Sequence, residues 1–190
     1  MSYRPITDVW ILGRPKTKYY GAFPAGFLKR ARVLLGATHD DPVLHVCGGK
    51  IREYKCGPAC KPGCVHGIGG RDKTLDLDPA CNPDFLQDAR ETFPLYRNHE
   101  GYLVEWKAVL IDRPYTEPDA DHYAPGRTVL PEANLLVKNG IAAVDVGGRV
   151  GILDYVWPMP PKNAREVAVI AVGTGRNNRA RWFTVFERIS

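Results

Sequence analysis

Short apolar runs of four to six residues recur along the chain and predict β-strands. The first four runs are nearly continuous rather than alternating, a pattern typical of parallel strands that are buried on both faces. Segments rich in Gly, Pro and polar residues separate the runs and predict turns and loops. The predicted strands are Val43–Cys47, Thr74–Leu77, Ala108–Ile111, Val150–Tyr155, Val167–Val172 and Trp182–Phe186.

Two segments show helical periodicity instead. In residues 24–36, apolar side chains at positions 27, 28, 31, 34 and 35 fall on one face of a 3.6-residue period, and Gly36 is a suitable stop. A weaker helical pattern covers residues 132–143. The face of the first helix opposite its apolar side is predicted to carry Lys29, Arg30 and Arg32.

The two last predicted strands are joined by residues 173–181, which are rich in Gly and Asn and favour a hairpin. With 19 Gly and 16 Pro in 190 residues, loops are many and helices few. The predicted fold is therefore α/β: a Rossmann-like, mostly parallel sheet that a C-terminal antiparallel hairpin closes. Residues 1–190 fit one domain.

Glycines and acids follow three of the predicted parallel strands. Gly48 and Gly49 follow the first, Asp76 lies at the end of the second, and Asp112 follows the third. In open α/β sheets, ligands bind outside the carboxyl ends of the strands. These residues therefore predict a ligand site at that edge.

The charge is divided along the chain. The formal net charge is +5, but residues 1–36 contribute +6, residues 162–190 contribute +4, and the middle is −5. Basic flanks around an acidic middle suit contact with phosphates. The alternative is that the flanks are solvated surface.

Composition excludes several classes of protein. With 44% hydrophobic residues, the chain is neither disordered nor fibrous. No apolar run approaches the ~20 residues that span a bilayer, so we expect no membrane partner. The N-terminus lacks the pattern of a signal peptide, and we expect a reducing, cytoplasmic location.

Cysteines cluster in residues 56–66, a loop that has no apolar pattern to order it. Four thiol or imidazole ligands within eleven residues can bind zinc tetrahedrally, which predicts a structural zinc site. The alternatives are an iron–sulfur centre or unrelated side chains in a loop. The candidate ligands are Cys56, Cys60, Cys64 and His66.

Read in chain order, six segments resemble the class I S-adenosylmethionine-dependent methyltransferases, above all the DNA amino-methyltransferases with an Asp/Asn-Pro-Pro-aromatic signature. The resemblance implies transfer of a methyl group to an exocyclic amine of a nucleobase, with DNA as the favoured substrate and RNA as an open alternative. The segments are YYGAFPAGF (19–27), VLHVCGG (43–49), LDLDP (75–79), PDFLQDAR (83–90), VLIDRPYT (109–116) and VGGRVGILDY (146–155), the last read as a glycine turn and a strand.

The resemblance also implies a set of cofactor-binding residues. Asp76 would accept hydrogen bonds from the ribose hydroxyls, with Asp78 as the fallback, and Asp88 would lie at the adenine edge. The alternative for these acids is that they cap turns. The implied cofactor-binding residues are Tyr20, Phe23, Cys47, Gly48, Asp76 and Asp88.

Asp112, Pro114 and Tyr115 occupy the position of the family's catalytic signature. An exocyclic amine is a poor nucleophile because its lone pair is delocalised into the ring. A carboxylate and a backbone carbonyl that accept its N–H groups can draw the nitrogen towards tetrahedral geometry, while Tyr115 stacks on the extruded base. The alternative is an ordinary type I turn after a strand.

Arg113 departs from the family's pattern, which has Pro at this position. It either contacts a substrate phosphate, together with Lys29 and Arg32, or fills the acceptor pocket of an inactive relative. The glycine turn, CGGK, is also atypical, and the separation of twelve positions from Asp76 to Asp88 is too short for a full helix. The alternatives to a DNA methyltransferase are an inactive nucleic-acid-binding protein and a methyltransferase acting on RNA or a small molecule.

Overall fold

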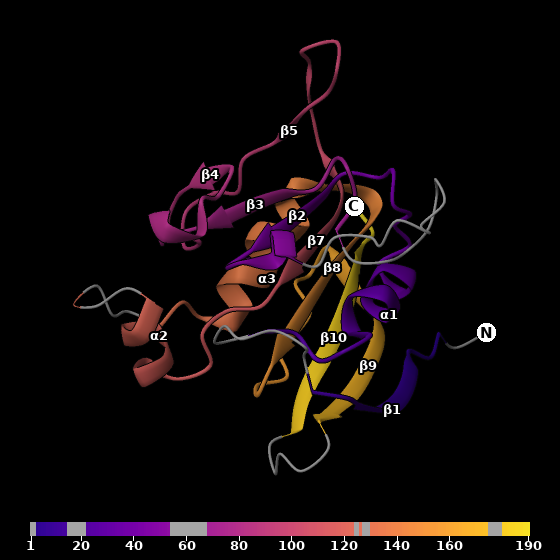
Figure 1. The fold of residues 1–190 in the computed structure, drawn as a ribbon. Helices are drawn as coiled ribbons and strands as arrows, with labels where there is room; N and C mark the ends of the chain where they lie inside the picture. Colours follow the sequence, from indigo (N-terminus) through magenta and orange to yellow (C-terminus); the bar gives the residue numbers. More distant parts are fainter. Residues whose placement is uncertain (1–2, 15–21, 54–67, 124–125, 127–129, 175–179) are drawn as a thin grey trace.

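The computed structural model describes residues 3–14, 22–53, 68–123, 126, 130–174 and 180–190. Their main element is an eight-stranded sheet in the order β1-β9-β10-β8-β7-β2-β3-β4 (Figure 1). Neighbouring strands are parallel, except that β10 is antiparallel to both β8 and β9. The strands are β1 (Ile6–Leu12), β2 (Val43–Val46), β3 (Lys73–Asp76), β4 (Phe85–Leu86), β7 (Trp106–Ile111), β8 (Val144–Asp154), β9 (Ala164–Thr174) and β10 (Ala180–Arg188).

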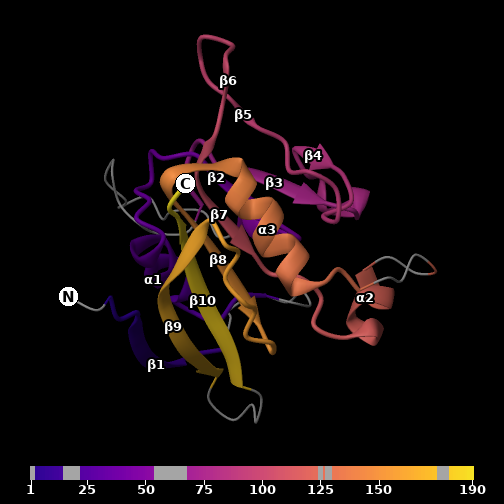
Figure 2. The same ribbon diagram turned by 180° about the vertical axis from the view of Figure 1, so that it is seen from behind.

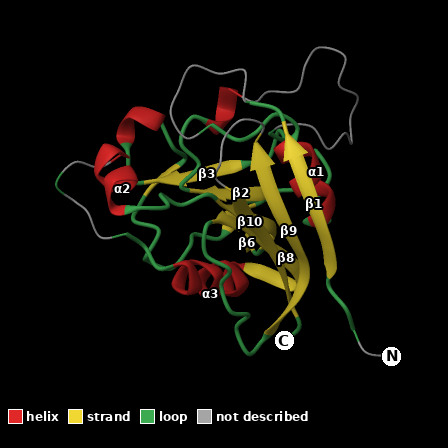
Figure 3. Cartoon of the chain, turned by 90° about the horizontal axis from the view of Figure 1, so that it is seen from below, coloured by secondary structure: helices red, strands yellow, loops and turns green. Residues whose placement is uncertain are grey.

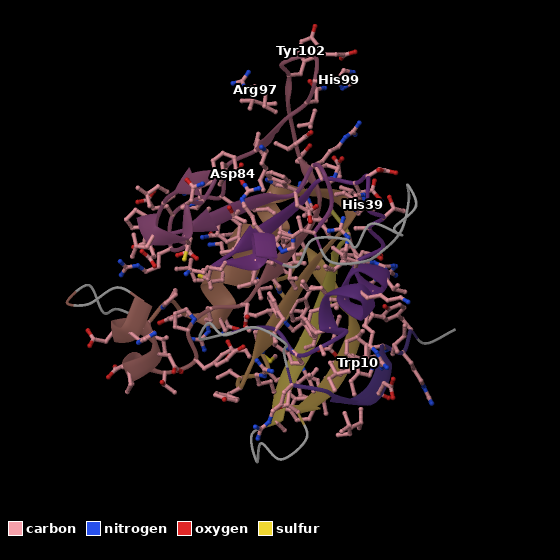
Figure 4. All side chains as sticks on the ribbon, viewed as in Figure 1. Trp10, His39, Asp84, Arg97, His99 and Tyr102 are labelled. Carbon is pink, nitrogen blue, oxygen red and sulfur yellow. The ribbon has the colours of Figure 1, made fainter. Side chains whose placement is uncertain are left out.

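Two helices cover opposite faces of this sheet, as Figures 2 and 3 show. Helix α1 (Phe27–Leu34) packs on one face and α3 (Ala133–Ala143) on the other, each with its own apolar core. A third helix, α2 (Glu117–Tyr123), follows β7, and short 3₁₀ turns cover Ile51–Glu53 and Pro79–Cys81. Strands β5 (Tyr96–Arg97) and β6 (Leu103–Val104) form a separate ribbon, whose projecting end carries the labelled His99 and Tyr102 in Figure 4.

Aromatic rings anchor α1 to the sheet. Phe27 lies edge-on to Phe183 of β10, with ring centroids 5.0 Å apart, and Trp10 of β1 contacts both rings at 6.3 and 6.0 Å. These three side chains belong to segments that are far apart in the sequence. Their packing joins the N-terminal strand to the C-terminal hairpin.

A buried charge cluster joins the end of α1 to the strands of the site. Arg32 donates to Asp72 at 2.6 Å and to the carbonyl of Thr38 at 2.5 Å, and His45 of β2 lies 2.9 Å from Asp72. Burial opposes ionisation of Asp72, but His45 and Arg32 lower the pKa of this carboxyl group. The prediction that Arg32 faces outwards for nucleic acid is therefore wrong, because its guanidinium is fully buried and ion-paired.

The predicted sheet, its parallel strands and its C-terminal hairpin are confirmed. One local prediction is wrong: residues 146–148 form no turn before the strand but belong to β8, where Gly147 has φ +83° and the pairing with β7 shifts register. The short 3₁₀ turn after β3 agrees with the absence of a full helix between Asp76 and Asp88.

Strand β1 was not predicted. Only Trp10 and Leu12 of its seven residues are buried, and Thr7 and Asp8 interrupt its apolar run. It becomes a strand through long-range parallel pairing with β9. The unpredicted helix α2, EPDADHY, likewise has no apolar face in its sequence.

None of the described helices is long and apolar enough to cross a membrane.

Helix α3 packs closely against β8 at Gly140. A Cβ atom there would lie 2.8 Å from Cγ1 of Val150, whose side chain is fully buried. Glycine is therefore required for the helix–sheet distance.

We expect Gly140→Ala to lower the free energy of unfolding by about 1–2 kcal/mol, because overpacking outweighs the gain in helix propensity. Urea denaturation measures the change. Gly70→Ala is the control, since no atom lies within 4 Å of its added Cβ. Equal stability of the two variants would contradict the close approach.

Candidate active site

The order of the strands reverses between β2 and β7. From β2 the chain continues to β3 and β4 on one side, and then returns to β7 on the other side of β2. Because these strands are parallel, their carboxyl ends lie at one edge of the sheet (Figure 1). Such a reversal point is where open α/β sheets bind ligands.

The turn after β2 has a constrained backbone. Cys47 has φ +53° and Gly49 has φ +50°, and the amides of Cys47 and Gly48 both donate to the carbonyl of Leu75 on β3. A Cβ atom on Gly48 would lie 3.2 Å from the carbonyl oxygen of His45. The turn therefore lies close against β3 and keeps a side-chain-free surface at the reversal point.

Asp76 adjoins this turn at the end of β3. Its carboxylate accepts from the amide of Gly49 at 2.8 Å and from the amide of Asp78 at 2.9 Å, one on each oxygen. Burial raises the pKa of the carboxyl group. Since each carboxylate oxygen has a second lone pair, Asp76 can also accept two hydroxyl groups of a ligand.

The fallback residue, Asp78, has a different role in the structure. It caps the short 3₁₀ turn that follows, where its side chain accepts from the amide of Ala80 at 2.9 Å. This is the turn-capping alternative considered for these acids.

Asp112 lies across the reversal point from Asp76. Its amide donates to the carbonyl of Val46 at 3.2 Å, so the ends of β7 and β2 are tied together. Burial raises the pKa of its carboxyl group to about 7, although Arg181 and a hydrogen bond from Tyr115 act in the opposite direction. Asp112 is therefore a carboxyl group that can exchange a proton near neutral pH.

The hydroxyl of Tyr115 donates to Asp112 Oδ1 and accepts from Arg181 Nη1 at 3.0 Å. The Tyr115 ring also lies 4.7 Å from that of Tyr155, at an angle of 52°. Tyr115 therefore links Asp112 to β10. That its ring stacks on a base stays a prediction.

Arg113 points away from Asp112, towards the end of β8. Its guanidinium donates to both oxygens of Asp154 at 2.5 and 3.2 Å, and its side chain is only 5% exposed. At the position where the family signature has a proline, this chain therefore has an arginine whose guanidinium forms a buried, bidentate ion pair. Contact with a substrate phosphate would require this pair to open.

The remaining predicted cofactor and nucleic-acid residues are dispersed. Asp88 is ion-paired with Arg90, which lowers the pKa of its carboxyl group. Phe23 is buried and its ring stacks on that of Phe27 at 5.2 Å. Lys29 is exposed on α1. Pro114 lies half-buried between Arg113 and Tyr115.

The predicted zinc ligands Cys56, Cys60, Cys64 and His66 lie outside the described residues, as does Tyr20. Within the described ranges, no group of three or more His, Cys, Asp or Glu residues is arranged to hold a metal ion. The thiol of Cys47 has a strongly raised pKa, because it is buried and lies near Asp76 and Asp112. An uncharged thiol can line the site without adding a negative charge beside the two acids.

Sequence reasoning missed three residues of this site: Asp154, Tyr155 and Arg181. The first two are the last residues of a predicted strand, so the rule that selected Asp76 and Asp112 could have found them. Arg181 carried no such signal. It lies at the start of β10, which runs antiparallel to β8, so the amino end of this strand lies at the edge where the parallel strands end.

No model of a protein family matches the sequence, and no curated protein matches it. Solved structures do match. TrmN from Thermus thermophilus has a TM-score of 0.56 and 15% identity, with 88% of this chain covered and 49% of TrmN. A mutant of MtNAS has a TM-score of 0.50 and 12% identity, with 86% of this chain covered and 59% of MtNAS.

The N-methyltransferase NodS from Bradyrhizobium japonicum has a TM-score of 0.49 and 9% identity, with 85% and 96% of the two chains covered. Compared with TrmN, this chain spans about half of that protein's length. Identities this low show the fold alone. The chain has the fold of the class I S-adenosylmethionine-dependent methyltransferases, which confirms at the level of the fold the resemblance that its sequence indicates.

The Arg113–Asp154 pair generates a stability prediction. We expect Arg113→Met to lower the free energy of unfolding by ~3–5 kcal/mol, because it leaves a buried carboxylate without its partner. The double variant Arg113→Met/Asp154→Leu should recover most of this loss. Denaturant titration of the three proteins measures it, and no recovery in the double variant would show that the pair is not the cause.

Asp112 generates a prediction for pH. Its pKa is about 7 in the folded chain against 3.8 for an ordinary carboxyl. The folded state therefore keeps this proton up to a higher pH than the unfolded state does. As the pH rises from about 4 to about 7, ionisation of Asp112 lowers the free energy of unfolding by up to about 4 kcal/mol. Asp112→Asn should remove that part of the fall. Unfolding curves of both proteins across this range test it; parallel profiles would contradict a raised pKa.

Proposed function

We propose that this protein is an S-adenosylmethionine-dependent methyltransferase that acts on an exocyclic amine of a nucleobase. The observation that carries the proposal is the position of two acids on opposite sides of the point where the strand order reverses. Asp76 adjoins the glycine turn, and Asp112 has a pKa near neutrality on the other side.

The residues present fit the cofactor at the β2–β3 end. The turn at Gly48 and Gly49 gives a close approach to backbone, and Asp76 retains acceptors for two neighbouring hydroxyls, which is the chemistry of a ribose. When bound, the cofactor supplies a methyl group activated by a sulfonium. The neutral thiol of Cys47 lies near both Asp76 and Asp112 and adds no competing charge.

Asp112 would act on the amine. An amine that accepted the methyl group of the cofactor would carry a positive charge on its nitrogen. The carboxylate of Asp112 would take the proton that this nitrogen then loses. A carboxylate with a pKa near 7 is a better proton acceptor than one near 4. The backbone carbonyl of Arg113 is the second acceptor that the family resemblance assigns.

Tyr115 and Arg181 would position Asp112. The Tyr115 hydroxyl holds one carboxylate oxygen, and Arg181 holds that hydroxyl in turn. Arg181 also favours the ionised form of Asp112 that accepts a proton. The other carboxylate oxygen of Asp112 remains the one to meet the amine.

The charge distribution supports a nucleic acid as the substrate. The fold brings the two basic flanks of the sequence together, because β1 pairs with β9 and β9 pairs with β10. By sequence these flanks carry +6 and +4, and basic segments suit contact with phosphates. The DRPY string favours DNA, and the test compares DNA with RNA.

We expect Asp76→Ala to weaken S-adenosylmethionine binding by ~1–3 kcal/mol, since ligand hydroxyls lose their acceptor. Asp112→Asn should bind the cofactor as wild type does but transfer methyl groups roughly 10²–10⁴-fold more slowly. Calorimetry measures binding, and labelled methyl transfer to unmethylated DNA and RNA measures activity.

Asp78→Ala is the matched control, because the side chain of this neighbouring acid bonds within its own turn, to the Ala80 amide and the Cys81 thiol. Its cofactor affinity should equal that of wild type. A wild-type protein that binds no S-adenosylmethionine would refute the proposal. Cofactor binding without transfer to either polymer would favour the inactive, nucleic-acid-binding alternative.

A further inference from the structure

The turn that follows β4 continues the candidate site beyond Asp76. Strand β4 pairs in parallel with β3, where Asp76 lies opposite Leu86, and the amide of Gln87 donates to the carbonyl of Asp76 at 3.1 Å. The segment after β4 therefore starts beside Asp76, at the carboxyl edge of the sheet where ligands bind. We name residues 87–91 the β4 turn.

Hydrogen bonds within the β4 turn give it a closed shape. The amide of Glu91 donates to the carbonyl of Asp88 at 3.0 Å. Arg90 donates to the Asp88 carboxylate from its backbone amide at 2.9 Å and from Nη2 at 2.5 Å. The hydrogen bond from Arg90 lowers the pKa of Asp88, so this carboxyl group is an ionised hydrogen-bond acceptor at neutral pH.

One side chain of α3 holds the β4 turn from outside. Asn139 is half-buried on α3, and its Nδ2 atom reaches three successive carbonyl oxygens of the turn. It donates to Glu91 at 2.8 Å, to Arg90 at 3.3 Å and to Ala89 at 3.5 Å. A single amide group therefore sets the direction of three peptide groups that come directly after Asp88.

Apolar packing alone does not set this direction. Ala89 and Phe93 are buried in the core that α3 shares with the sheet, but contacts between apolar groups are not directional. Hydrogen bonds are, because a donor must lie near the lone pairs of the carbonyl oxygen. Asp88 lies between two fixed points, the bond from Gln87 to Asp76 on one side and the bonds to Asn139 on the other.

The proposed function supplies a group for the β4 turn to contact. The strand order β7-β2-β3-β4 places Asp112, the glycine turn, Asp76 and the β4 turn one after another along the edge (Figure 1). In S-adenosylmethionine, the sulfonium and the adenine are attached at opposite ends of the ribose. With the methyl group towards Asp112 and the ribose at Asp76, the adenine lies towards β4. Burial and nearby charges, among them Asp88, raise the pKa of the Cys47 thiol, so Asp88 is within electrostatic reach of this region.

We propose that Asn139 is a positioning residue that determines the specificity for the base of the cofactor. By fixing the β4 turn, it directs Asp88 at the exocyclic amine of the adenine, so that the site selects adenine over a purine without this amine. The amine donates to a carboxylate, and a purine that lacks it leaves Asp88 without that donor. This inference rests on the proposed function for the identity of the cofactor.

The test is the preference for S-adenosylhomocysteine over its 6-deamino analogue, in which hydrogen replaces the amino group. Calorimetry gives the two dissociation constants. Wild type should prefer the ligand with the amine roughly 10-fold, the effect of one hydrogen bond to a charged group. Asn139→Asp turns an acceptor towards the three carbonyls, and Asn139→Ala removes the donor. Each variant should reduce the preference to about 3-fold or less.

Asn134→Asp is the matched control, because it makes the same substitution on the same helix. Asn134 Oδ1 accepts from the amide of Met159 at 3.0 Å, and a carboxylate keeps this acceptor. Its preference should equal that of wild type. A merely structural role of Asn139 would weaken the binding of both ligands equally, so an unchanged ratio in the folded Asn139 variants would overturn the proposal.

The two proposals fail separately. A wild-type protein that binds S-adenosylhomocysteine and its 6-deamino analogue equally well would refute the role of the β4 turn and leave the enzymatic function standing. A wild-type protein that binds neither ligand would refute the proposed function itself.

Discussion

The parallel pairing of β2 with β7 is the constraint on which the candidate site depends. It is the contact between segments separated by the whole of β3 to β6, and it brings the turn at Cys47 and the end of β7 to one edge. The amide of Asp112 donates to the carbonyl of Val46 across this ladder. If that register shifted by one residue, Asp112 would turn to the other face and lose its position opposite Asp76.

Buried charge pairs hold this arrangement on both sides. Arg32, Asp72 and His45 anchor β2 to the chain that follows α1, and Arg113 with Asp154 joins the ends of β7 and β8. Burying such charges is costly, so each pair contributes geometry more than net stability. Asp112 lies between them with a weaker partner, the Tyr115 hydroxyl. This difference in partners explains why burial raises its pKa while that of Asp72 is lowered.

The strands on the two sides of the reversal point supply different groups to this edge of the sheet. Strands β3 and β2 present backbone and Asp76, which suit a small ligand with hydroxyl groups. Strands β8 and β10 bring Asp154 and Arg181 to the same edge, where they contact Arg113 and Tyr115. Asp112 stands at the boundary, where a group from each side can meet it.

The sequence by itself determined the positions of the main strands, the mostly parallel sheet and the acids at the strand ends. These are local properties: an apolar run followed by a polar turn is visible within ten residues, and parallel strands place their carboxyl ends together. Asp76 and Asp112 could therefore be predicted as members of one edge. Only the tertiary structure decided the partners of the charged side chains. Arg32 and Asp72 are 40 residues apart, Arg113 and Asp154 are 41, and Tyr115 and Arg181 are 66. No periodicity encodes such pairs, because burial of a long charged side chain depends on where its counter-charge arrives. For the same reason β1, with two buried residues, became a strand only by pairing with β9.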